Sequence, residues 1–279
     1  MQIDTIRLQS LRWPRGTSAR IWFCQPQVEL TTPAPFRPTI AGRSLDILRA
    51  VLDRDAQKGA PAGDAPSIVL LPELSIDIAD IAAVRGLLSA ARTNTLLICG
   101  VGHMSAADVN SIEPSFHLCG EPIAGHYANC ALIGCGGTDE IFLQPKVVAS
   151  REELDCHWPG RVIRYFVGEF FSFVVLICSE MLDRAQARTT IHEVLNKLAE
   201  DSQQLAAIFW LQHNPKPRSV DFSQSLGELT HLDRPTVFVV GSRKQCPPRF
   251  ENFAASGALF KKAVLPRHFN VLTRRFHWG

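Results

Sequence analysis

Short apolar runs recur along the chain, and polar residues or glycine- and proline-containing breaks separate them. Short runs rich in β-branched and aromatic side chains are typical of strands that are buried on both faces. We therefore predict strands at Ile21–Cys24, Ile68–Leu71, Leu96–Gly100, Tyr127–Gly134, Glu140–Gln144, Arg161–Val167, Phe173–Ile177, Leu205–Leu211 and Thr236–Gly241, with late strands at Ser256–Phe260 and Phe269–Thr273.

Segments with helical spacing of apolar residues lie between several of these strands. The spacing predicts helices at Ser44–Asp53, Asp80–Ala91 and Ala185–Glu200, and a further helix at Ser219–Leu232. Residues 104–125 carry no clear period and read as a hairpin or loop. Strands that alternate with helices, with hairpin-like pairs between them, indicate an α/β domain with mixed sheets and outer helices.

The length of 279 residues fits one large domain or two small ones. We predict a single domain over residues 1–279, because no internal repeat or low-complexity segment divides the chain. Residues 1–20 are basic and irregular in pattern, so we expect them to form an N-terminal arm. Residues 261–279 are expected to form a C-terminal tail.

Composition narrows the possible functions. The formal net charge of +2 gives no support for a nucleic-acid partner, and no apolar run reaches the ~18 residues of a membrane span. The N-terminus lacks the pattern of a secretory signal, and several of the eight cysteines lie inside apolar runs. We therefore expect a cytoplasmic protein with reduced cysteines. No paired metal-ligand spacing is present, so we expect neither a metal nor a cofactor.

Three polar residues follow apolar strands in the same local pattern. Glu73, Lys146 and Cys178 each stand just after a predicted strand. If these strand ends lie at one edge of the fold, a carboxylate, an ammonium group and a thiol share one site, and that set can perform acyl transfer. Taken alone, Cys178 is more often a buried core residue and Lys146 a surface lysine. The matched contexts favour a catalytic site.

These segments resemble the signatures of the carbon–nitrogen hydrolase family, the nitrilase superfamily. Five landmarks occur in the family's order along residues 20–180, and the rest of the chain matches loosely. They are Leu70-Leu-Pro-Glu-Leu-Ser75, Tyr127-Ala-Asn-Cys-Ala-Leu-Ile133, Leu143-Gln-Pro-Lys146, Trp158-Pro-Gly160 and Leu176-Ile-Cys-Ser-Glu180. The resemblance implies an αββα sandwich that pairs with a second copy into a four-layer homodimer or higher oligomer.

By the same resemblance, Cys178 is the nucleophile, Glu73 the general base and Lys146 the stabiliser of the oxyanion. The family uses a second glutamate after the lysine. Glu153 is our choice, because of its distance ahead of Gly160, and Glu152 and Asp155 are its rivals. The implied activity is hydrolysis of a small amide or nitrile, with an amide favoured, through a thioester.

The chain also departs from the family pattern. Ser179 follows the cysteine, where members commonly carry an aromatic residue. We expect Ser179, Glu180, His213 and Asn214 to contact the substrate or to support the catalytic groups, although a plain turn also explains the last two. The alternative function is a nitrilase-like binding or regulatory module within a larger assembly. A weaker alternative is a redox-sensing role for Cys178.

Overall fold

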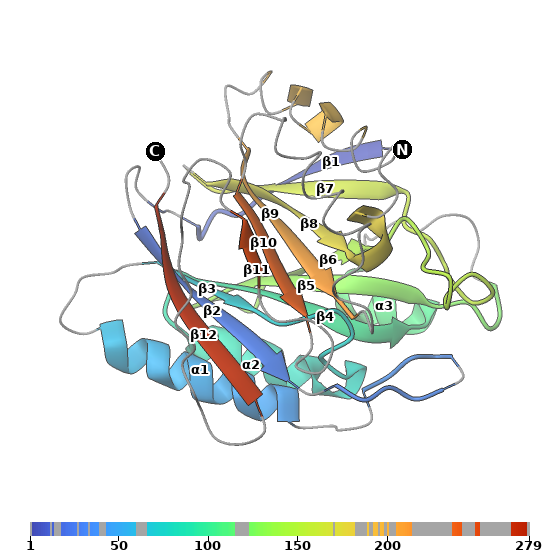
Figure 1. Cartoon of the computed structure of the whole chain (residues 1–279), viewed down its shortest axis with the longest axis horizontal. Helices are drawn as coiled ribbons and strands as arrows, with labels where there is room; N and C mark the ends of the chain where they lie inside the picture. Colours follow the sequence, from blue (N-terminus) through green and yellow to red (C-terminus); the bar gives the residue numbers. More distant parts are fainter. Residues whose placement is uncertain are drawn as a thin grey trace.

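The computed structural model describes residues 2–11, 13, 18–26, 28–32, 34–38, 43–59, 66–114, 123–169, 171–181, 189, 192–194, 196–197, 200, 205–213, 236–241, 249–251 and 269–277. Their strands form two six-stranded mixed sheets that face each other (Figure 1). Sheet A has the order β1 (Gln2–Arg7), β7 (Val162–Val167), β8 (Ser172–Ile177), β9 (Leu205–Gln212), β10 (Thr236–Gly241) and β11 (Arg249–Glu251). Sheet B has the order β12 (Phe269–His277), β2 (Ser18–Pro26), β3 (Ser67–Leu70), β4 (Thr95–Met104), β5 (Ala128–Cys135) and β6 (Ile141–Pro145).

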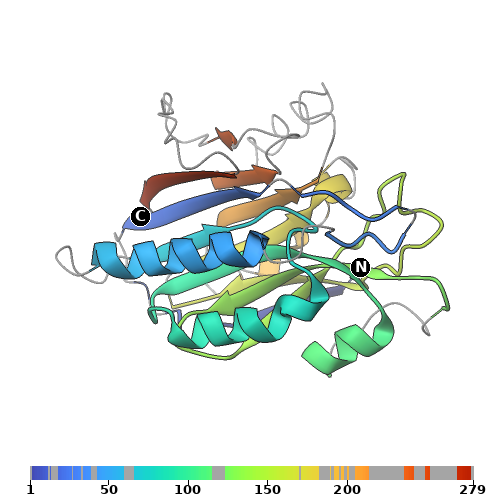
Figure 2. The ribbon, with the colours of Figure 1, turned by 90° about the horizontal axis from the view of Figure 1, so that it is seen from below.

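Helices cover the face of sheet B that points away from sheet A (Figure 2). They are α1 (Arg43–Gly59), α2 (Ile81–Ala90) and α3 (Ala106–Ile112), and a short 3-10 helix, η1 (Ile78–Asp80), leads into α2. A second 3-10 helix, η2 (Cys178–Met181), directly follows β8. None of the helices in the described part of the chain combines the length and the apolar character needed to cross a membrane.

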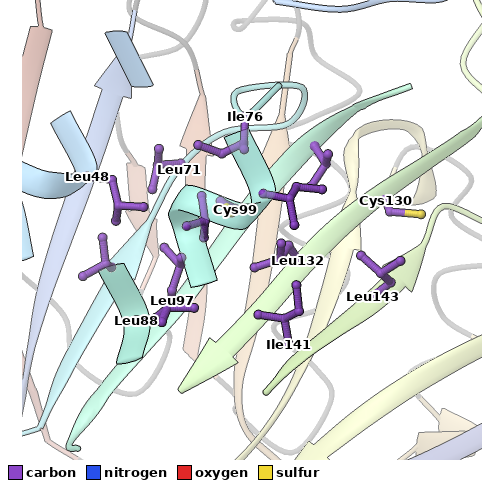
Figure 3. Packing of buried hydrophobic residues seen from close by; sticks show 14 of the residues in the cluster. Leu48, Leu71, Ile76, Leu88, Leu97, Cys99, Cys130, Leu132, Ile141 and Leu143 are labelled. Atoms are coloured by element: carbon purple, nitrogen blue, oxygen red, sulfur yellow. The ribbon is translucent and has the colours of Figure 1, made fainter. Parts of the chain in front are cut away.

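The two faces of sheet B bury two different cores, as the period of a strand requires. On β2, Ile21 and Phe23 pack between the sheets, whereas Trp22 and Cys24 pack against the helices. The helix-side core is shown in Figure 3, where Leu48 of α1 lies beside Leu71, and Leu88 of α2 lies beside Leu97 of β4. Both faces of the sheet are therefore apolar, which explains the nearly continuous apolar runs in the sequence.

A buried carboxylate fixes α1 to the strands beneath it. Asp55 accepts hydrogen bonds from the Trp22 indole at 2.9 Å, the Ser67 hydroxyl at 2.6 Å and the Arg20 guanidinium at 3.0 Å. Arg92 adds an ion pair at 3.5 Å. A buried carboxylate is tolerated when its acceptor positions are filled in this way.

Most of the predicted strands are confirmed, together with the first two helices. One error is the N-terminal segment, because its described residues contain regular structure that an irregular arm would lack. Gln2–Arg7 is instead β1, which pairs in parallel with β7, and Ile3 lies opposite Ile163. Another error is residues 104–125, where α3 begins with a capping box between Ser105 and Asp108.

The late strand is longer than predicted and runs to His277, antiparallel to β2, so the expected C-terminal tail also contains regular structure. The predicted helix at Ser219–Leu232 and the predicted strand at Ser256–Phe260 lie outside the described residues.

Candidate active site

Three of the predicted site residues come together between the two sheets. Glu73 follows β3 and Lys146 follows β6, both in sheet B, while Cys178 follows β8 in sheet A. Their exposed fractions are 2%, 1% and 8%. A buried carboxylate and a buried ammonium group are stable only when each has charged or hydrogen-bonding partners.

Lys146 supplies the central positive charge of the site. Its Nζ lies 2.9 Å from Oε1 of Glu73 and 2.6 Å from Oε2 of Glu153. Burial by itself would lower the pKa of Lys146, but Glu73, Glu153 and Cys178 outweigh it and raise the pKa above its usual value. The ammonium group therefore stays charged between two carboxylates.

The backbone presents Cys178 in an uncommon conformation. Its φ angle is +44°, in the left-handed region that favours glycine, and Leu74, next to Glu73, has a φ of +56°. The Trp210 indole donates a hydrogen bond of 3.0 Å to the carbonyl of Cys178 and helps to hold this turn. Non-glycine residues in this region cluster at functional sites, where the surrounding structure enforces the strain.

The thiol of Cys178 is in its protonated form at rest. Burial raises its pKa, the neighbouring Glu73 raises it further, and Lys146 acts in the opposite direction without overcoming them. Because the thiolate is the reactive form, such a thiol needs a base beside it. Glu73 is the carboxylate in position to serve.

Ser179 and Glu180 connect the turn at Cys178 to the segment after Lys146. The hydroxyl of Ser179 donates to the carbonyl of Val148 at 2.6 Å. The carboxylate of Glu180 accepts the backbone N–H groups of Val147 and Ile177, both at 2.6 Å. Ser179, at the position where family members commonly carry an aromatic residue, therefore connects the turn at Cys178 to the segment after Lys146.

The structure distinguishes Glu153 from its two rivals. Glu153 is buried against Lys146, whereas Glu152 and Asp155 are exposed. Burial would raise the pKa of Glu153, but Lys146 and the hydrogen bonds within the site lower it well below its usual range. Glu153 is therefore a carboxylate that remains ionised.

The end of β9 also reaches the site. The backbone N–H of His213 donates to Oε2 of Glu73 at 2.8 Å. Burial lowers the pKa of the His213 imidazole, so this side chain is neutral near pH 7. Asn214, which we also predicted for the site, lies outside the described residues.

Two residues of the site were missed in the sequence. Asn129 on β5 donates to Glu73 at 2.8 Å and to Glu153 at 2.6 Å, and His103 on β4 lies 3.1 Å from Glu153. Both are fully buried. The available signal was a lone polar residue inside an otherwise apolar strand, since a buried amide or imidazole must find a partner.

The arrangement can perform proton transfer, nucleophilic attack and stabilisation of an oxyanion. It holds a thiol, a carboxylate next to that thiol and an ammonium group 2.9 Å from the same carboxylate. Within the described part of the chain, no group of three or more histidine, cysteine, aspartate or glutamate side chains is placed to hold a metal ion.

The fold of the chain is that of amidases of the nitrilase superfamily. A structure of the amidase from Nesterenkonia sp. AN1, which carries the acetamide moiety of fluoroacetamide on its active-site cysteine, superimposes with a TM-score of 0.55 and 13% identity. That match covers 82% of this chain and 78% of the amidase.

Two further structures of the Nesterenkonia amidase give the same result. A cysteine-to-alanine mutant, described as belonging to the nitrilase superfamily, matches with a TM-score of 0.56 and 14% identity over 85% of this chain and 81% of the amidase. A mutant in complex with butyramide matches with a TM-score of 0.54 and 14% identity over 82% and 78%. No family model and no curated protein matches the sequence.

Proposed function

We propose that the protein is a cysteine-dependent hydrolase of non-peptide carbon–nitrogen bonds, with a small amide as the favoured substrate class. The observation that carries the proposal is the buried cluster of Glu73, Lys146 and Glu153 beside Cys178. The Nesterenkonia amidase, whose structures hold an acetamide moiety and butyramide on a similar fold, supports an amide over a nitrile.

The first half of the reaction forms a thioester. Glu73 takes the proton of the Cys178 thiol as the sulfur attacks the carbonyl carbon of the amide. The resulting oxyanion is stabilised by the ammonium group of Lys146, and the backbone N–H after Cys178 is a second candidate donor. The protonated Glu73 then gives its proton to the leaving nitrogen, the carbon–nitrogen bond breaks, and ammonia or an amine departs.

The second half restores the enzyme. A water molecule loses a proton to Glu73 and its oxygen attacks the thioester carbon. The carbon–sulfur bond breaks, the carboxylic acid leaves, and Glu73 returns the proton to the sulfur of Cys178. Lys146 keeps its positive charge throughout, so it stabilises both tetrahedral intermediates without exchanging protons. The ionised Glu153 helps to hold Lys146 in its charged form.

Selective labelling of Cys178 tests the proposal. Fluoroacetamide should modify Cys178 in the intact protein, as located by mass spectrometry of its peptides. Cys178→Ala should abolish labelling and reduce turnover of small amides by at least about a thousandfold. Cys156→Ala is the matched control, because Cys156 is a partly exposed thiol that lies outside the cluster. The Cys156→Ala variant should be labelled at Cys178 and should turn over small amides at the wild-type rate.

Two results would contradict the proposal. If fluoroacetamide leaves Cys178 unmodified and no amide or nitrile from a panel of short-chain compounds is consumed, the site is not a hydrolase. In that case the chain is a binding or regulatory module on the nitrilase-like fold. Turnover by Cys178→Ala at the wild-type rate would equally overturn the assigned nucleophile.

A further inference from the structure

We infer that His103 is a positioning residue that directs the proton of Cys178 to Glu73 by filling the last acceptor position of Glu153. This inference rests on the proposed function. An ionised carboxylate offers about four acceptor positions. The two glutamates of the site differ in how many of these positions are occupied, and His103 contributes to that difference.

Glu153 is saturated with donors. Its Oε1 receives Asn129 at 2.6 Å and His103 at 3.1 Å, and its Oε2 receives Lys146 at 2.6 Å and the Ser150 N–H at 2.9 Å. A proton could bind to Glu153 only if one of these donors were displaced. Such a carboxylate is a poor base.

Glu73 has one position left among the described residues. Its Oε1 receives Asn129 at 2.8 Å and Lys146 at 2.9 Å, and its Oε2 receives the His213 N–H at 2.8 Å. Oε2 therefore retains a lone pair for the thiol proton. Asn129 and Lys146 donate to both carboxylates. The difference in filled acceptor positions between the two glutamates therefore comes from the donors that reach only one of them.

The protonation of His103 follows from its contacts. Glu153 can only accept, so Nε2 of His103 must carry the hydrogen in their contact. Nδ1 is buried and has no hydrogen-bond partner among the described residues. A hydrogen on Nδ1 would be left without an acceptor, which favours the neutral ring over the imidazolium. Phe36 and Tyr127 flank the ring, with centroids 4.9 Å and 6.2 Å away, and hold its plane.

Other ionisable groups face this pair. His157 and Cys156 come from the same loop as Glu153, and burial lowers the pKa of His157 to about 4, so it is neutral near pH 7. Asp155 lies on that loop but is exposed. The remaining ionisable groups near this pair, from both sheets, are Lys146, Glu73 and Cys178. Within the described residues, neither His157 nor Cys156 makes a hydrogen bond to the carboxylate of Glu153, so they do not replace His103.

The test compares two variants of one side chain. His103→Phe keeps a ring between Phe36 and Tyr127 but removes the donor. His103→Gln keeps an N–H group near the position of Nε2. We expect His103→Phe to slow fluoroacetamide labelling of Cys178 about tenfold near pH 7 and to move the acid limb of the pH–rate profile to higher pH. Glu153 can then compete for the proton. His103→Gln should label within about threefold of the wild type.

A second measurement does not depend on reactivity. Nitrogen-15 NMR of histidine-labelled wild-type protein should show His103 with a hydrogen on Nε2 and none on Nδ1 near pH 7. Thermal unfolding of both variants establishes that they are folded. An Nδ1–H tautomer, an imidazolium, or a His103→Phe variant with the wild-type rate and pH profile would overturn the inference.

The two proposals can fail separately. If fluoroacetamide does not label the wild-type protein and no short-chain amide or nitrile is consumed, the proposed function fails, and the role of His103 in proton transfer fails with it. The NMR spectrum still decides whether His103 donates to Glu153. If the wild type is labelled and His103→Phe behaves like it, only the inference about His103 is wrong.

Discussion

The carboxyl group of Glu180 couples the stability of the folded protein to pH. Burial raises its pKa to about 7 from an ordinary value of 4.5, against the opposing effect of its hydrogen bonds to Val147 and Ile177. A folded-state pKa above the unfolded value means that the folded protein binds more protons in this window. The contribution of Glu180 to the free energy of unfolding therefore falls as the pH rises from about 4.5 to about 7, and it is level above that range.

Glu180→Gln should remove this pH dependence. The amide nitrogen of glutamine would face one of two backbone N–H groups that both need an acceptor, so we also expect a loss of about 1–3 kcal/mol of stability. Urea unfolding at a series of pH values measures both effects. Glu152→Gln, on an exposed side chain, is the control and should follow the wild type. Equal pH dependence in wild type and Glu180→Gln would contradict the prediction.

At the scale of single residues, the sequence predicts those site residues that stand at a strand end. Glu73, Lys146 and Cys178 are visible because a polar residue directly interrupts an apolar run. His103 and Asn129 are not, since their partners lie far away in sequence and only the fold brings them together. The choice of Glu153 over Glu152 likewise needed the resemblance, because the three acidic residues of that segment have similar local sequence.

At the scale of elements, β4 must pass very close to the segment that carries Glu73. A Cβ atom on Gly100 would lie 2.3 Å from the Cα of Glu73 and 2.6 Å from the nitrogen of Leu74. Both are backbone atoms and cannot rotate away. Glycine at this position therefore allows the turn after β3 to lie against the strand.

Gly100→Ala should displace Glu73 from Lys146 and Cys178. We expect a loss of several kcal/mol of stability and at least a tenfold slower labelling of Cys178. Gly86→Ala is the matched control. Gly86 lies in α2 with no atom within 4 Å of its added Cβ, so alanine should stabilise the protein by up to about 1 kcal/mol. Wild-type labelling and melting by Gly100→Ala would show that the turn can shift without consequence.

The sequence pattern is clearest for strands inside a sheet and for long helices. β3, β4 and β8 are buried on both faces, so their sequences are mostly apolar. α3 is only seven residues long, with Val109 and Ile112 as its buried side chains, so it has too few turns to show a period. The capping pair Ser105 and Asp108 was its available signal.

At the scale of the whole molecule, the first and the last described strands each form an edge of one sheet. β1 pairs in parallel with β7 at the edge of sheet A, and β12 pairs antiparallel with β2 at the edge of sheet B. An edge strand buries less apolar surface and shows a weaker pattern, which explains why residues 1–20 read as an irregular arm. The homodimer implied by the resemblance stays a prediction, which sedimentation equilibrium would check.

The pairing of β12 with β2 leads to a prediction about truncation. Its register runs from Phe269 opposite Pro26 to His277 opposite Ser18, so nine residues of β2 have their partner here. Removal of residues 269–279 would leave those backbone groups unpaired on an apolar strand, which is a template for aggregation. We expect the truncated protein to be mostly insoluble, or to unfold at a clearly lower temperature.

Deletion of residues 278–279 alone is the control for this truncation, since it leaves β12 intact, and it should melt like the full chain. The site residues Glu73, Lys146 and Cys178 all lie outside β12, so the truncation should act through stability and not through the chemistry of the site. Any truncated protein that remains folded at low temperature should therefore still label at Cys178. Full solubility and an unchanged melting temperature would mean that β2 does not need this partner.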